Sequence, residues 1–75
     1  MMMRRIEELR EEEAKGVWRV DVAGWWCFSK AVNSKRELEE LIDSVLENWC
    51  EAHLEYYIDP EERKIVFYTT VPEYA

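Results

Sequence analysis

The stretch 34-SKRELEELIDSVLENW-49 decides the fold, because it carries the strongest helical pattern in the chain. Ser34 is a natural N-cap residue, and Glu37 follows three residues later, as in a capping box. Apolar side chains then recur at three- and four-residue spacing, at Leu38, Leu41, Ile42, Val45, Leu46 and Trp49. Acidic side chains occupy the other side of this pattern. It predicts an amphipathic helix over 34–53 that contributes most of the core.

The segment before this helix has a period of two, which is typical of strands. Apolar and polar side chains alternate from Trp18 to Val22, and Ala23-Gly24 separates them from the aromatic run Trp25-Trp26-Cys27-Phe28. This predicts a hairpin over 17–32. A two-residue loop would place Trp25 and Cys27 on the face of Trp18, and a three-residue loop would place Trp26 and Phe28 there. We favour the three-residue loop, because it groups the larger rings.

The segment after the helix predicts a second hairpin, over 54–71. Side chains alternate again from Leu54 to Asp59, and Pro60 presets the backbone of a turn before a strand that begins at Lys64. At the other end of the chain, Ile6 and Leu9 form the apolar seam of a charged helix predicted over 3–15. We expect Gly16 to end that helix, with Lys15 near its last carbonyls.

These elements predict one α+β domain over 1–75, in the order helix, strand, strand, helix, strand, strand. We expect a four-stranded antiparallel sheet with both helices on one face. The other face would then expose Tyr57, Val66, Tyr68 and either Trp25 or Trp26. An exposed apolar surface of this kind usually marks a contact with a partner or with a second copy.

Composition excludes several classes of protein. Among 75 residues, 10 are basic and 17 acidic, which gives a net charge of −7 and argues against a nucleic-acid partner. The apolar runs are too short to cross a membrane, and no apolar segment follows Arg4-Arg5 as in a secretory signal. We therefore expect a soluble cytoplasmic protein. The chain has no Gln and much Glu and Arg, a bias found both in thermophile proteins and in idealised designed sequences.

Few residues point to catalysis or to a cofactor. His53 is the one histidine, so every histidine-dependent triad would need it. Cys50 and His53 are three residues apart on the helix, and Cys27 could join them in a three-ligand metal site. The alternative is that both cysteines are structural, either as free thiols or as one disulfide. We expect no bound cofactor.

One junction resembles a known family. The order of elements, together with Ala52-His53-Leu54-Glu55-Tyr56 and Thr69-Thr70-Val71, is similar to the pterin carbinolamine dehydratase family. In that family the helix ends in a His-His-Pro-acid-aromatic motif and the last strand ends in Thr-His. His53 would match the second histidine, Glu55 the acid, Tyr56 the aromatic residue and Thr70 the threonine. Ala52, Leu54 and Val71 depart from the pattern.

The resemblance implies a pterin site in which His53 moves a proton and Glu55 orients it. The rings of Trp26, Tyr56, Tyr57 and Tyr68 would stack on the heterocycle. Because the dehydratase reaction needs several imidazoles and this chain has one, we expect no turnover. Two hypotheses follow: a non-catalytic interaction domain that uses the open sheet face or an edge strand, and a divergent dehydratase-like or pterin-binding protein.

Overall fold

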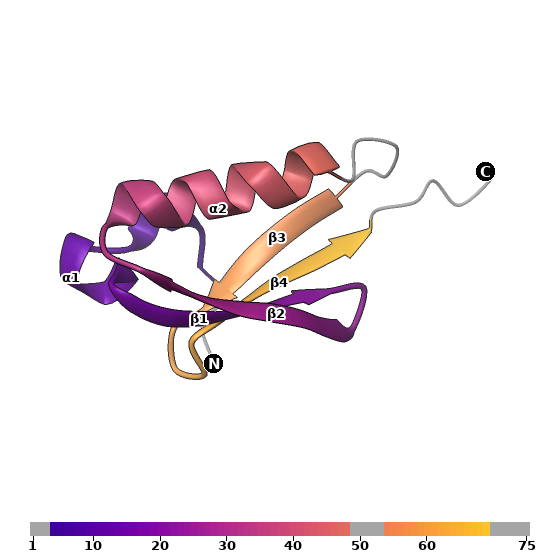
Figure 1. Ribbon diagram of the computed structural model, residues 1–75, viewed down its shortest axis with the longest axis horizontal. Coiled ribbons are helices and arrows are strands. Elements are labelled where there is room, and N and C mark those ends of the chain that lie inside the picture. Colours follow the sequence, from indigo (N-terminus) through magenta and orange to yellow (C-terminus); the bar gives the residue numbers. More distant parts are fainter. Residues whose placement is uncertain (1–3, 49–53, 70–75) are drawn as a thin grey trace.

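The computed structural model describes residues 4–48 and 54–69. In chain order the elements are η1 (Ile6–Glu8, a 3-10 turn), α1 (Glu11–Ala14), β1 (Gly16–Val22), β2 (Trp25–Val32), α2 (Lys35–Asn48), β3 (Leu54–Asp59) and β4 (Lys64–Thr69). Figure 1 shows α2 lying across one face of a sheet made by the four strands. The predicted α+β class is confirmed.

Helix α2 begins where the capping pattern predicts. The backbone N–H of Glu37 donates to Ser34 Oγ at 3.1 Å, and the Glu37 carboxylate accepts from the backbone N–H of Asn33 at 2.6 Å. The apolar stripe faces the sheet and buries Leu38, Leu41, Ile42 and Val45. Residues 49–53 of the predicted helix lie outside the described residues.

The first hairpin has a two-residue loop, so the expected three-residue loop is wrong. Val22 pairs with Trp25, and both Ala23 (φ 53°) and Gly24 (φ 84°) adopt the positive φ that a type I′ turn requires. A bulge then leaves Cys27 without a partner, because Asp21 pairs with Trp26 and Val20 with Phe28. Because of the bulge, Phe28 lies on the same face as Trp18. The three-residue loop had been expected to place it there.

The sheet is mixed, and the expectation of a purely antiparallel sheet is wrong. The strand order is β2-β1-β4-β3, with β1 and β4 parallel in the centre. Helix α2 carries the chain across the sheet from one edge strand to the other, and the second hairpin brings β4 back to the middle. This order buries the strands with the largest apolar side chains, Trp18 and Val20 on β1 and Ile65 and Phe67 on β4.

The predicted helix over 3–15 is broken into η1 and α1 by extended backbone at Leu9. With this bend Ile6, Leu9 and Ala14 are all buried, and the Arg4 side chain reaches the Glu13 carboxylate. Glu8 and Glu13 each accept a backbone N–H three residues earlier, from Arg5 and Arg10, at 2.8 Å.

The N-terminal segment also covers part of the β3 edge. Arg4 forms an antiparallel bridge with Ile58, in which Arg4 N donates to Ile58 O at 3.1 Å and Ile58 N to Arg4 O at 2.7 Å. The segment then packs against α2 through both η1 and α1. One edge of the sheet, β3, is therefore partly covered, whereas the opposite edge is β2.

Candidate interaction surface

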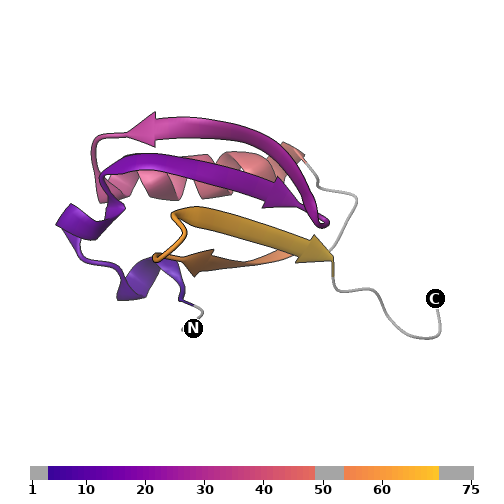
Figure 2. The same ribbon diagram turned by 90° about the horizontal axis from the view of Figure 1, so that it is seen from below.

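The face of the sheet opposite α2, the open face, is crossed by two rows of side chains. Cross-strand pairing aligns Trp26, Asp21, Val66 and Tyr57 in one row and Ser29, Arg19, Lys64 and Asp59 in the next. Figure 2 looks onto this face, and no described helix lies in front of it. The first row is largely apolar and the second is polar, so the face has two chemically different ends.

The apolar end forms the surface that we call the aromatic patch, made of Trp26, Tyr57, Val66 and Tyr68. Trp26 is 58% exposed and Tyr68 41%, whereas Tyr57 and Val66 are half-buried. The rings of Tyr57 and Tyr68 lie side by side, with centroids 6.1 Å apart and an angle of 44° between their planes. The sequence prediction that Tyr57, Val66, Tyr68 and one of the two tryptophans share a face is confirmed, and that tryptophan is Trp26.

The carboxylates beside the aromatic patch are paired with arginines. Asp21 is 8% exposed, and Arg19 Nε lies 2.7 Å from its Oδ1. Glu55, which pairs with Tyr68 across the strands, lies 3.5 Å from Arg5 Nη1. Because each negative charge has a cation close by, the patch presents apolar surface with little net charge.

Strand β2 presents a second exposed surface at one edge of the sheet. It is an edge strand whose side chains are exposed along its length except at Val32. Trp25 is 77% exposed, and Cys27 is an exposed free thiol. The sequence had marked these aromatic residues as a strand but did not indicate that the strand lies at an edge.

Strand β2 has no acidic side chains. Its one charged residue is Lys30. Helix α2 in contrast carries Glu37, Glu39, Glu40, Asp43 and Glu47. The negative charge of the chain is thus concentrated away from the β2 edge, so two copies would meet the least like-charge repulsion there.

The residues predicted for a pterin site do not come together among the described residues. His53 and Thr70 lie outside the described ranges. Tyr56 is buried on the α2 side of the sheet, where its hydroxyl accepts the backbone N–H of Ile6 at 3.3 Å and its ring packs 6.0 Å from Phe67. Tyr56 therefore lies on the face opposite to Trp26, Tyr57 and Tyr68 and cannot stack on the same ligand. The family resemblance stays a prediction.

The metal-site alternative is not assembled in the described part of the chain. Cys27 lies on the exposed β2 strand, and Cys50 and His53 both fall in the range 49–53 that the structure does not describe. Within residues 4–48 and 54–69, no three His, Cys, Asp or Glu side chains lie close enough to hold an ion.

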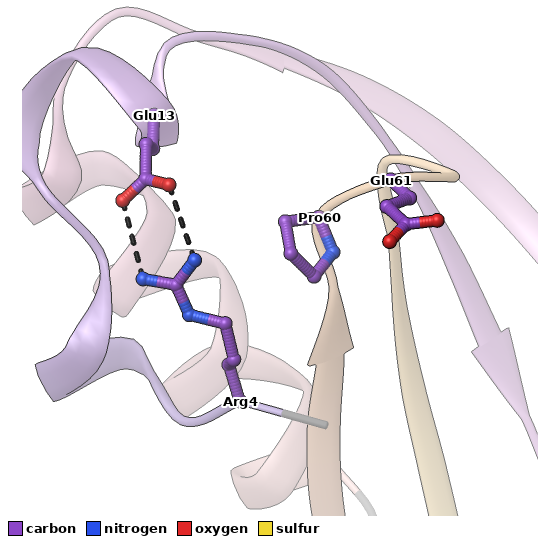
Figure 3. A pocket seen from close by; sticks show the side chains of 4 residues that line it. All are labelled: Arg4, Glu13, Pro60 and Glu61. Carbon is purple, nitrogen blue, oxygen red and sulfur yellow. Dashed lines mark hydrogen bonds and ion pairs between the residues drawn. The ribbon is translucent and has the colours of Figure 1, made fainter. Parts of the chain in front are cut away.

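Two pockets lie near the N-terminal segment. The larger, of about 330 Å³, is lined by Arg4, Glu13, Pro60 and Glu61. Figure 3 shows the Arg4 guanidinium turned toward the Glu13 carboxylate across it, with N–O distances of 3.1 and 3.2 Å. Because Arg4 is already engaged, this pocket presents an ion pair and no free guanidinium to an anion.

The smaller pocket, of about 200 Å³, runs between η1 and α2. Ile42, Leu46 and Tyr56 line it, and the Arg5 guanidinium lies 4.4 Å from the centroid of the Tyr56 ring. The chain's own cation therefore occupies the aromatic surface that a ligand cation would use.

Glu13 is the described group with a resolved pKa shift. The pKa of its carboxyl lies below the ordinary value of 4.5, first because it accepts the backbone N–H of Arg10 and second because it accepts hydrogen bonds from the Arg4 side chain. These partners hold α1 and the start of the chain together, so the shift reflects structure and not an acid–base site.

Comparisons with protein-family models, with curated proteins and with solved structures each found no match. In the described ranges, neither helix has the length and apolar composition needed to cross a membrane. The function has to be argued from the exposed surfaces, and the aromatic patch and the β2 edge are the two that stand out.

Proposed function

We propose that this chain is a non-catalytic interaction domain that contacts a second copy of itself through the aromatic patch. The observation that carries the proposal is the set of exposed or half-buried side chains of Trp26, Val66, Tyr57 and Tyr68 on a face that no described helix covers. Exposing the rings of Trp26, Tyr57 and Tyr68 to water does not stabilise the isolated chain. Burying them against another apolar surface would be favourable.

The charge distribution supports a second copy as the partner. Each chain carries a net charge of −7, so two copies repel one another wherever their acidic surfaces meet. The carboxylates of Asp21 and Glu55 beside the patch are paired with Arg19 and Arg5, which leaves this end of the sheet with little net charge. Small α+β domains commonly pair through exposed sheets, which gives the same expectation.

The proposal is tested by measuring the molar mass of the chain against its concentration by size exclusion with light scattering. We expect the mass to rise with concentration in the parent chain, and Tyr68→Glu, which adds a charge inside the patch, to prevent the rise. Ser44→Glu is the matched control, because it adds the same charge on the exposed side of α2. Equal behaviour of the two variants, or a mass that stays at 9.1 kDa at every concentration, would count against the patch.

A further inference from the structure

The two edges of the sheet differ in how their backbone groups are covered. The outer side of β3 is bridged by Arg4 at Ile58, as described above. The outer side of β2 has no strand or bridge partner among the described residues. An uncovered edge strand presents a row of free N–H and C=O groups, and these groups are satisfied best by another extended strand.

The direction of the backbone groups of β2 follows from the pairing of β1. Arg19 N–H donates to Arg63 O at 2.9 Å, on the β4 side, so the backbone groups of Arg19 point away from β2. In an antiparallel ladder the residue opposite such a position also points its N–H and C=O outward. The residue opposite Arg19 is Ser29, and the same alternation applies to Ala31 two residues on. Lys30 between them points its backbone groups toward β1.

Protection against edge pairing is weak on β2. Natural edge strands avoid pairing by means of charged side chains, proline or bulges. This strand has one lysine, no proline and one bulge at Cys27, which leaves 28–32 as regular extended backbone. An edge without carboxylates in a chain of net charge −7 also lacks the repulsion that would keep a second copy away.

We infer that two copies of the chain pair through β2, antiparallel, with Ser29 opposite Ser29 of the second copy, so that the two sheets join into one. This inference goes beyond the proposed function: it adds a contact at the β2 edge, which β1 separates from Tyr68 on β4 and from Tyr57 on β3. Ser29 would exchange both backbone hydrogen bonds with its counterpart, and Ala31 would face Cys27.

Side-chain chemistry selects this register. With Ser29 at the symmetry axis, each Lys30 lies beside Phe28 of the other copy, where a cation over an aromatic ring is favourable. A shift that centres Lys30 would set the two ammonium groups directly opposite one another, which is unfavourable. The Ser29 register also places the aromatic patches of both copies, with Trp26 nearest the junction, on the same face of the joined sheet.

The area available predicts a reversible complex. With about 200 Å² per aromatic side chain, the exposed parts of Trp25, Trp26 and Phe28 amount to roughly 350 Å² per copy. A stable interface buries about 800 Å² per partner, so this one falls in the range of weak complexes. We therefore expect a weak complex that dissociates on dilution.

Amide hydrogen exchange measured at low and high protein concentration tests the pairing in the unaltered chain. We expect the amides of Ser29 and Ala31 to become protected as concentration rises. Lys30 is the internal control, because its N–H faces β1 and is protected at both concentrations. Exchange at Ser29 and Ala31 that is fast and independent of concentration up to about 1 mM would overturn the inference.

Two variants separate edge pairing from patch contact. Ser29→Pro removes the outward N–H and leaves the β1 ladder bonds in place, whereas Ser29→Ala keeps the N–H. We expect Ser29→Pro to lower the molar mass reached at high concentration and Ser29→Ala to leave it unchanged. If Tyr68→Glu lowers this mass and Ser29→Pro does not, edge pairing is wrong and the proposed function stands. If only Ser29→Pro lowers it, edge pairing stands and the aromatic patch is wrong.

A charge exchange tests the identity of the partner and the register together. Ser29→Lys alone and Ser29→Glu alone place like charges across the symmetry axis, so we expect each variant to lose pairing through β2. Mixing the two places opposite charges there and should restore pairing. If the mixture does not regain this pairing while both variants are folded, the Ser29 register is wrong.

Discussion

The guanidinium of Arg63 lies over the ring of Trp18, with Cζ 4.2 Å from the ring centroid. Its Nη1 donates to Glu13 O at 2.7 Å and its Nη2 donates to Lys15 O. One side chain from the β3–β4 turn therefore covers the buried tryptophan and satisfies the carbonyls that end α1. The sequence suggested Lys15 for that second role, and the structure assigns it to Arg63.

Arg63→Ala should destabilise the fold by about 2 kcal/mol. The substitution removes a cation–π contact and two charged hydrogen bonds, and it leaves the Glu13 carbonyl without its partner. Urea denaturation followed by far-UV circular dichroism measures the change. Arg36→Ala is the control, because Arg36 is exposed and its pair with Glu40 at 3.7 Å should be worth less than about 0.5 kcal/mol. Similar losses for both variants would argue against the anchoring role of Arg63.

Gly16→Ala should cost more stability than Gly24→Ala. Both glycines have positive φ, 122° and 84°, so each substitution carries a backbone cost of about 1 kcal/mol. A methyl group at Gly16 would also collide with the Arg63 guanidinium, whereas the space around Gly24 is empty. In an Arg63→Ala background the excess cost at Gly16 should disappear, which a double-mutant cycle detects. An excess that persists there would show that the collision is not its cause.

Leu38→Ala and Leu41→Ala should each cost about 2 to 4 kcal/mol, because both side chains are buried between α2 and the sheet. Glu40→Ala on the exposed side of the same helix should cost less than about 0.5 kcal/mol. Chemical denaturation of the three variants compares them directly. If the glutamate variant is as unstable as the leucine variants, the orientation of α2 is wrong.

The Glu13 carboxylate should make stability fall in acid. Its folded-state pKa is below the ordinary value of 4.5, so the unfolded chain takes up this proton at a higher pH than the folded chain does. The stabilisation is complete above about pH 4.5 and is lost as the pH falls through the lowered folded-state value. The stability difference between the parent chain and Glu13→Gln should therefore narrow on acidification from pH 6. A difference that stays constant down to pH 3 would contradict the assignment.

Local signals in the sequence predicted the elements well and their assembly less well. Residues close together in the sequence are enough to predict three features: the cap at Ser34, the buried stripe from Leu38 to Val45 and the two hairpins. The strand that pairs with β1 is decided by how much apolar area each strand buries against α2. The periodicity of the sequence shows which side chains share a face, but it does not show the order of the strands. The break at Leu9 likewise depends on contacts far away in the chain.

The candidate surface was predictable in part for the same reason. Alternation assigns Tyr57, Val66 and Tyr68 to one face, since side chains two residues apart in a strand share a face. Trp26 could not be chosen over Trp25 because the sequence left the length of the loop at Ala23-Gly24 open, and the two-residue loop places Trp26 on the open face. Tyr56 was expected to join the rings around a ligand, but it lies on the face opposite to Tyr57 and contributes to the core.

Backbone and side-chain NMR shifts, followed as the chain is concentrated from about 20 µM to 1 mM, test the contact surface without any substitution. The account predicts that the changes gather on β2 and on the aromatic patch, above all at Ser29, Trp26 and Tyr68, while the acidic side of α2 stays unchanged. Changes confined to Glu39, Glu40 and Asp43 of α2, or spectra that do not change at all, would contradict it.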